Sequence, residues 1–213
     1  GLGAKVVSLD MSVAIDACHE TTRVHGDLVQ CIQGSIYAIP LRSNAFDAVH
    51  CAGVIQHTPD PERTILSMPR LIKPNGRLGY NFYELTWSRR LQLIRAGLRM
   101  FTPHMSQPAL LRLCRIMVAP LFPLSRIVSR IRFVRFGLRF LPISASHQPE
   151  LSREAQYEWT LLDTFDWYNP RYDQPQRHTR VAELLQQADF TEVESSHGIA
   201  RARKKNKRQN WSG

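Results

Sequence analysis

An aspartate directly after a short apolar segment is the first feature of this sequence that could do chemistry. Asp10 follows residues 4–9, which have the short, β-branched and apolar character of a strand. In nucleotide-binding α/β folds, an acidic residue just past the second strand accepts hydrogen bonds from ribose hydroxyls, about 20 residues after a glycine-rich loop. An aspartate at a strand end is also suited to capping the next helix, so Asp10 alone leaves both roles open.

The glycine-rich loop that should precede such an aspartate is absent from the sequence. Counting back about 20 residues from Asp10 passes the first residue of the chain, and Gly1 and Gly3 are too close to Asp10 to form the loop. We therefore expect a fold that lacks its first strand and that loop, as in a fragment or a degraded gene.

Strand and helix patterns alternate through the first 84 residues. The patterns predict a strand at 4–9, a helix at about 13–22, strands at 28–33 and 46–51, a helix at about 61–72, a turn at 73–76 and a strand at 77–83. They resume with a helix at about 179–188 and a strand at 190–196. This alternation is typical of an α/β fold with a mostly parallel sheet covered by helices.

Residues 85–149 break this rhythm. They contain 11 arginines but no lysine and no acidic residue, in long helical stretches broken at prolines 103, 108, 120, 123 and 142. We predict an inserted α-helical cap at 85–149 between a core at 1–84 and its return at 150–200. A basic tail at 201–213 is expected to be disordered.

The insertion also carries apolar stripes at helical spacing. One stripe consists of Ile127, Ile131, Val134 and Leu138, and the opposite side of the same helix carries Phe133, Phe136 and Phe140. A further stripe consists of Leu91, Ile94, Leu98 and Phe101. The phenylalanines with their flanking arginines suit a lid, a partner or an anionic lipid interface, and a solvated basic cap explains them as well.

Composition excludes several other classes of protein. The length of 213 residues and 43% hydrophobic content fit one globular domain with an insertion. The net charge of +10 is concentrated in the insertion and the tail. The four cysteines have no CxxC spacing, so neither a zinc site nor a disulfide framework is indicated. Without a signal segment or an 18-residue apolar run, we expect a cytoplasmic protein that can associate with membranes.

Five segments carry a family likeness: 6–12, 34–41 (GSIYAIPL), 46–49 (FDAV), 54–61 (VIQHTPDP) and 71–76 (LIKPNG). In this order and spacing they resemble the class I S-adenosylmethionine-dependent methyltransferases, especially the methyltransferase type 11 group. Residues 166–172 (DWYNPRY) and the pair His178-Thr179 look like the segment before the family's last helix. The resemblance implies a Rossmann-like methyltransferase fold with S-adenosylmethionine as cofactor.

The resemblance also implies which residues bind the cofactor. Asp10 would hold the ribose hydroxyls with Met11 near the adenosine, Ser35 and Ile36 would flank the adenine, and Cys51 and Ala52 would lie beside the methionine moiety. Ser35 departs from the family, which usually has Asp there. A hydroxyl is a weaker acceptor than a carboxylate for the adenine amino group.

Methyl transfer from a sulfonium needs a base only when the acceptor must lose a proton, because alignment supplies most of the catalysis. His57 is the candidate catalytic base, since an imidazole titrates near neutral pH and His57 follows the strand of Cys51. Ordering of its loop is the alternative role. Tyr168, Tyr172 and His178 are candidates for binding the acceptor, with packing of a lid as the alternative.

The sequence therefore predicts an S-adenosylmethionine-dependent methyltransferase that acts on a small-molecule or lipid-like acceptor. One alternative is a non-catalytic or membrane-peripheral protein that retains the fold, and another is an RNA-binding methyltransferase. Peripheral membrane contact would run through residues 89–140. Nucleic acid is the less favoured partner, because arginines interleaved with aromatic residues are not specific to it.

Overall fold

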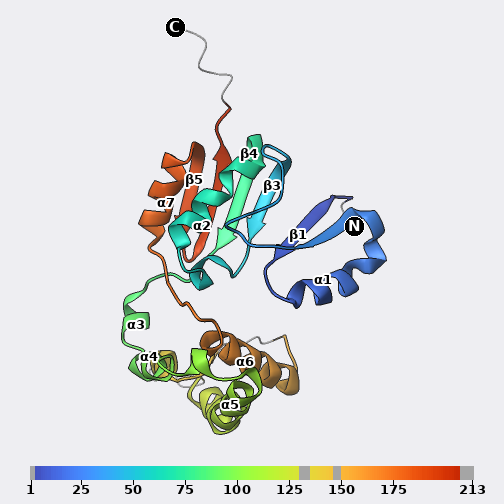
Figure 1. Ribbon diagram of the computed structural model, residues 1–213. Coiled ribbons are helices and arrows are strands. Elements are labelled where there is room, and N and C mark those ends of the chain that lie inside the picture. The colour runs from blue at the N-terminus through green and yellow to red at the C-terminus, as the bar shows by residue number, and fades with distance from the viewer. Residues whose placement is uncertain (1–2, 130–134, 146–149, 207–213) are drawn as a thin grey trace. The chain divides into compact units, whose positions relative to one another are not determined.

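The computed structural model describes residues 3–129, 135–145 and 150–206, and the chain folds into two compact units (Figure 1). Unit 1 comprises residues 1–84 and 174–213, and unit 2 comprises residues 85–173. Unit 2 begins where the sequence predicts the insertion. It extends beyond the predicted end at 149, however, so residues 150–173 belong with the helical insertion and not with the returning core.

The first part of unit 1 is a two-stranded parallel sheet with one helix. Strand β1 (Val6–Asp10) pairs with β2 (Val29–Gln33), and α1 (Ala14–Thr22) and a 3-10 helix (Arg23–Leu28) connect them. The sequence pattern predicted β1, α1 and β2 to within two residues, and it did not predict the 3-10 helix.

The second part of unit 1 is a four-stranded sheet with the order β3-β4-β6-β5. Strand β3 (Phe46–Cys51) pairs in parallel with β4 (Ile72–Asn81), while β6 (Ile199–Lys204) runs antiparallel between β4 and β5 (Phe190–Ser196). The helices are α2 (Pro61–Ser67) and α7 (His178–Gln187), with short 3-10 helices at Ile55–His57 and Pro69–Leu71. The expected Rossmann-like α/β architecture is thereby confirmed, with its core between sheet and helices.

Two predictions for unit 1 are wrong. Residues 201–204 form β6 instead of a disordered tail, because Ala200 and Ala202 face the core while Arg201 is exposed. The predicted turn at 73–76 lies within β4, at a register shift where Asn75 has a positive φ of 64°. Residues 207–213 of the predicted tail lie outside the described residues.

The edges of β1 and β3 have a defined relation in the topology expected for this fold. In the doubly wound order 3-2-1-4-5, strand 1 lies between strands 2 and 4. By the family resemblance, β1 and β3 are the second and fourth strands. Among the described residues, β1 pairs only with β2, and β3 pairs only with β4. Each therefore keeps one edge free, and Val6 on β1 is 47% exposed.

The regular elements among the described residues of unit 2 are all helices. It contains α3 (Trp87–Arg90), α4 (Leu93–Leu98), α5 (Gln107–Ser129) and α6 (Arg153–Tyr168), with 3-10 helices at Thr102–His104 and Arg135–Phe140. Its core joins α5 to α6 through Leu110, Cys114, Val118, Phe122, Ile143, Leu161 and Tyr168.

Helix α5 does not break at its prolines as predicted. Pro120 and Pro123 lie inside it. Each removes one backbone hydrogen bond, to the carbonyl four residues earlier. Pro120 is exposed on the side opposite the core, so the freed carbonyl of Ile116 is open to water.

The described parts of the predicted stripes at 127–140 are not one α-helix, because Ile127 lies in α5 whereas Arg135–Phe140 forms a 3-10 helix. Ile131, Phe133 and Val134 lie outside the described residues, as does the side chain of Phe136.

The turn between β5 and β6 requires a glycine, and replacing that glycine tests the geometry of the hairpin. His197 and Gly198 both have positive φ, and a Cβ on Gly198 would lie 2.7 Å from the carbonyl oxygen of Phe82. Gly198→Ala should therefore lower the free energy of unfolding by about 1–3 kcal/mol. Gly97→Ala is the control, because Gly97 lies in α4 with open space around it and the change should stabilise by up to about 1 kcal/mol. Equal melting temperatures for the two variants would contradict this account.

Candidate functional site

The carboxyl end of β1 is organised by the side chain of Asp10. Its Oδ1 accepts hydrogen bonds from the backbone N–H and the hydroxyl of Ser12, both at 2.7 Å. The Ser12 hydroxyl in turn accepts from the N–H of Ala14 at the start of α1, at 3.2 Å. Asp10 Oδ2 makes no hydrogen bond to any described residue. Asp10 thus shapes the turn with Oδ1, while its Oδ2 is not used in that turn.

The carboxyl end of β2 lies beside that of β1. The N–H of Gly34 donates to the carbonyl of Asp10 at 2.9 Å. Ser35 forms the next turn, because its hydroxyl accepts from the N–H of Tyr37 at 3.2 Å. Ile36 packs against the core of unit 1, and Met11 is 74% exposed. The structure therefore brings Asp10, Met11 and Ser35 to neighbouring strand ends.

The end of β3 places a buried thiol before an open backbone. Cys51 is 8% exposed, and burial raises the pKa of its thiol to about 11, so it stays neutral near pH 7. Ala52 is exposed. Gly53 has a φ of +68°, and its N–H donates to Asn81 Oδ1 at the end of β4. This segment offers a small, neutral surface.

His57 ends the 3-10 helix that follows β3. Its ring is half-buried and meets the ring of Tyr83 edge-on, with centroids 5.4 Å apart.

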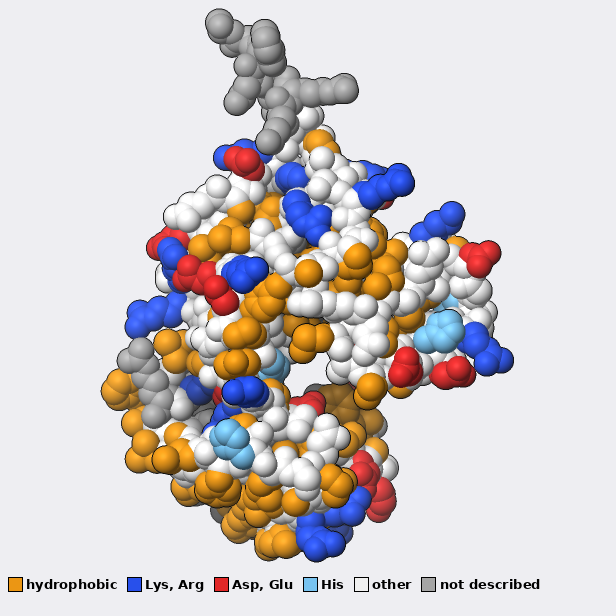
Figure 2. Space-filling view, in the orientation of Figure 1, with side chains coloured by type: hydrophobic (Ala, Val, Ile, Leu, Met, Phe, Trp, Pro, Cys, Tyr) orange, Lys and Arg blue, Asp and Glu red, His pale blue; other side chains and the backbone are white. Residues whose placement is uncertain are grey.

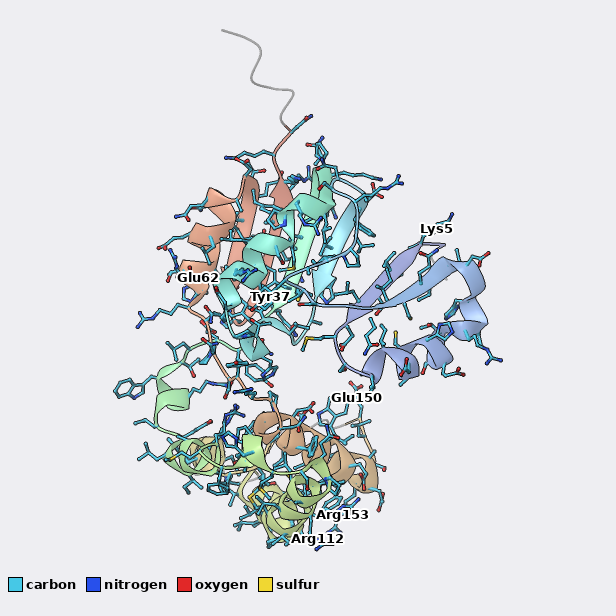
Figure 3. The ribbon with its side chains drawn as sticks, in the orientation of Figure 1. Lys5, Tyr37, Glu62, Arg112, Glu150 and Arg153 are labelled. Carbon is cyan, nitrogen blue, oxygen red and sulfur yellow. The ribbon has the colours of Figure 1, made fainter. Side chains whose placement is uncertain are left out.

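A hydrogen-bond network that the sequence did not predict fixes the loop around His57. The Tyr37 hydroxyl donates to the carbonyl of Asp60 and accepts from its N–H, both at 3.0 Å (Figure 3). Gln174 Nε2 donates to the carbonyls of Thr58 and Pro59, both at 2.9 Å. Tyr37 lies within a motif of the family resemblance, whereas no pattern in the sequence indicates Gln174.

The three residues predicted to bind the acceptor do not come together within one unit. Tyr168 is fully buried in the core of unit 2 and donates to the carbonyl of Pro142 at 2.9 Å. Its assignment to the acceptor is wrong, because its hydroxyl is already used inside the core. Tyr172 is half-buried in unit 2, and the Arg171 guanidinium lies 5.9 Å from its ring. His178 lies in unit 1, with Nδ1 3.0 Å from Glu84 Oε1.

Two further polar atoms lie buried near the strand ends. Tyr80 is paired with Cys51 across β3 and β4, and burial raises the pKa of its hydroxyl. The Tyr80 hydroxyl and Gln56 Oε1 have no hydrogen-bond partner among the described residues. Tyr80 thus places a buried tyrosine hydroxyl near the strand ends of unit 1.

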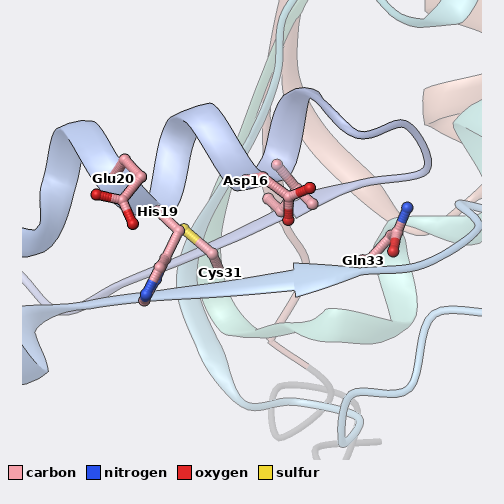
Figure 4. Close-up of a pocket in the computed structure, with 6 residues that line it drawn as sticks. Asp16, His19, Glu20, Cys31 and Gln33 are labelled. Carbon is pink, nitrogen blue, oxygen red and sulfur yellow. The ribbon is translucent and has the colours of Figure 1, made fainter.

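A hollow of 410 Å³ lies elsewhere, on the surface formed by α1 and β2 (Figure 4). Its lining consists of Ile15, Asp16, His19, Glu20, Cys31 and Gln33. None of the predicted site residues lines it. Among the described residues, no group of three or more His, Cys, Asp or Glu side chains is arranged to hold a metal ion.

Comparison with known proteins finds a family match for most of residues 1–84, the first segment of unit 1. Residues 1–79 match the family described as methyltransferase domain. Ubiquinone biosynthesis O-methyltransferase of Xanthomonas oryzae pv. oryzae is 33% identical over 82 residues, which are 36% of this chain and 33% of that protein. The enzyme of that name from Pectobacterium atrosepticum is 26% identical over 78 residues, covering 37% and 27%.

A solved structure extends the likeness in fold to nearly the whole chain. A SAM-dependent methyltransferase from Methanosarcina mazei aligns with a TM-score of 0.50 and 13% identity, over 95% of this chain and 83% of its own. The resemblance to the methyltransferase type 11 group is thus confirmed for residues 1–79, and beyond them the likeness is one of fold alone. The matched segment spans about a third or less of the curated relatives.

The correction at Tyr168 is testable through stability. Tyr168→Phe should lower the free energy of unfolding by about 1–2 kcal/mol, because the carbonyl of Pro142 loses its donor. Burial raises the pKa of Tyr168 from 10.0 to about 12, so the unfolded chain ionises first as pH rises above 10. The wild type should then lose stability relative to the variant, and the difference between them should shrink. Urea denaturation at pH 8 and pH 11 measures both effects, and a difference that grows with pH would contradict the burial.

Proposed function

We propose that this protein is an S-adenosylmethionine-dependent methyltransferase that acts on a small-molecule or lipid-like acceptor. The observation that carries the proposal is Asp10 within the matched segment 1–79, with Oδ1 held by Ser12 and Oδ2 open at a strand end. A carboxylate held in this way suits the two hydroxyls of a ribose. The relatives, named as O-methyltransferases, favour an oxygen acceptor.

The residues present fit part of the cofactor. Asp10 would bind the ribose, Met11 would pack near the adenosine, and Ser35 with Ile36 would flank the adenine. Cys51 and Ala52 would lie beside the methionine moiety, where a neutral thiol and a methyl group leave room for a positively charged sulfur. When bound, S-adenosylmethionine supplies a methyl group attached to that sulfur.

The remaining steps belong to the chain's own residues. His57 would accept the proton of an acceptor hydroxyl, and its ring is held in place by Tyr83 and by the loop that Tyr37 and Gln174 anchor. Tyr172 and His178 remain candidates for contacting the acceptor. Alignment of acceptor and cofactor would provide most of the rate.

A non-catalytic role is the second candidate. It is favoured by Ser35, which stands where the family usually has Asp, and whose hydroxyl already accepts a hydrogen bond from the N–H of Tyr37. A hydroxyl is a weaker acceptor than a carboxylate for the adenine amino group.

Calorimetric titration with S-adenosylmethionine tests the cofactor site. The 213-residue chain should bind weakly, and a longer form with the family's first strand and glycine loop ahead of residue 1 should bind tightly. In that form Asp10→Ala should cost about 1.5–3 kcal/mol of binding free energy, because a charged hydrogen bond is lost. Ser12→Ala is the control, since it removes the hydroxyl that donates to Oδ1 but keeps the carboxylate and the backbone N–H that also donates to it. An unchanged dissociation constant in Asp10→Ala would remove Asp10 from the site, and no binding by the longer form would favour the non-catalytic role.

The pH profile of methyl transfer tests His57. If His57 is the base, His57→Ala should lower turnover by about 100-fold and abolish the acidic limb of the profile. Tyr83→Phe is the control, because it keeps the ring that meets the imidazole. A His57→Ala variant with both the wild-type rate and the acidic limb would leave His57 as a loop anchor only.

A further inference from the structure

Helix α5 in unit 2 is apolar on two opposite sides. Its core side carries Leu110, Cys114, Val118 and Phe122, each at most 4% exposed. The opposite side, here called the outer strip, consists of Ala109, Ile116, Pro120, Leu124 and Ile127. All five are exposed, with Ile116 at 65% and Ile127 at 60%. At 100° per residue, they fall within one face of the helix.

Arginines border the outer strip on one flank. Arg112 and Arg115 are exposed, and neither makes an ion pair with any described residue. Figure 3 shows the Arg112 side chain directed away from the helices. Residues 85–149 contain no acidic side chain, so no negative charge in this segment offsets them. The flank therefore favours an anionic partner.

Helix α4 shows the same exposure of apolar side chains. Leu93 is 74% exposed and Ile94 59%, whereas the side chain of Arg95 is only 6% exposed. Arg95 points inward, where it pairs with Asp173 at 2.9 Å and stacks on Trp167 at 4.4 Å. A water-facing helix normally has the reverse arrangement. Figure 2 shows hydrophobic side chains over much of the visible face of unit 2.

We propose that unit 2 docks on the surface of an anionic lipid bilayer, with α5 lying in the plane of the interface. The outer strip would enter the boundary of head groups and acyl chains, and Arg112 and Arg115 would bind lipid phosphates. This inference goes beyond methyl transfer and does not depend on it.

Length and charge favour a bilayer over other partners. From Ala109 to Ile127 the strip runs about 27 Å along a straight helix, which matches a flat apolar surface. Among the described residues, no helix is long and apolar enough to cross a bilayer. A second copy of α5 would bring like-charged arginines together, and a nucleic acid would leave the strip uncovered.

Co-sedimentation with vesicles tests the proposal. The wild type should bind vesicles of mixed phosphatidylcholine and phosphatidylglycerol, more weakly at higher salt and far more weakly without phosphatidylglycerol. Arg112→Gln with Arg115→Gln should weaken binding about 30-fold, since each arginine near an anionic surface contributes about 1 kcal/mol. Ile116→Ser with Ile127→Ser should reduce binding to background.

A matched control tests whether binding requires the outer strip or any exposed apolar side chain. Val24→Ser replaces a valine of unit 1 that is 83% exposed, and it should bind vesicles like the wild type. All variants alter exposed side chains, so unchanged circular dichroism and melting temperature should accompany the loss of binding. Wild-type binding by the Ile116→Ser, Ile127→Ser variant would overturn the proposal. So would equal loss in Val24→Ser, preference for RNA over vesicles, or a dimer in sedimentation that the Ile→Ser changes dissolve.

Discussion

Hydrogen bonding between parallel strands is the constraint on which the rest of unit 1 depends. A strand inside a sheet needs a neighbour on each side, and β1 and β3 each have one. The carboxyl end of β1 carries Asp10, and the carboxyl end of β3 carries Cys51. The two halves of the candidate cofactor site are thus built by separate pairs of strands, and a strand between them would set their spacing.

Local patterning predicted the elements whose signals are strong, and β1, β2, β3 and α7 lie close to where periodicity placed them. Local patterning failed where contacts between residues distant in sequence determine the secondary structure. The buried side chains of strand β6 are those of Ala200 and Ala202, and they alternate with arginines, so the sequence pattern did not indicate a strand there. Helix α5 continues through two prolines, because packing against α6 outweighs two lost hydrogen bonds. Motifs placed Asp10 and Ser35 at strand ends, but Tyr168 could not be told from a surface tyrosine, since burial depends on the whole fold.

Three arginines of unit 2 point inward, where they make ion pairs and hydrogen bonds. Asp173 receives Arg89 at 2.6 Å and Arg95 at 2.9 Å, and Arg99 donates to the carbonyl of Pro170 at 2.8 Å. These contacts tie the first helices of the insertion to its last residues and draw three positive charges inside. The leucines and isoleucines beside them are left facing outward. A unit that approaches lipids would give a lipid-like acceptor a short route to a methyltransferase, which links the two proposals chemically.

The position of β6 has a consequence for the order of events during synthesis. Strand β6 lies between β4 and β5, so these two strands cannot join one sheet until residue 204 has left the ribosome. Residues 85–173 are complete well before that, and their contacts lie closer together in sequence. The helical insertion is thus able to fold before β6 has paired with β4. Until then, the nascent chain exposes the edge of β4 that β6 will cover.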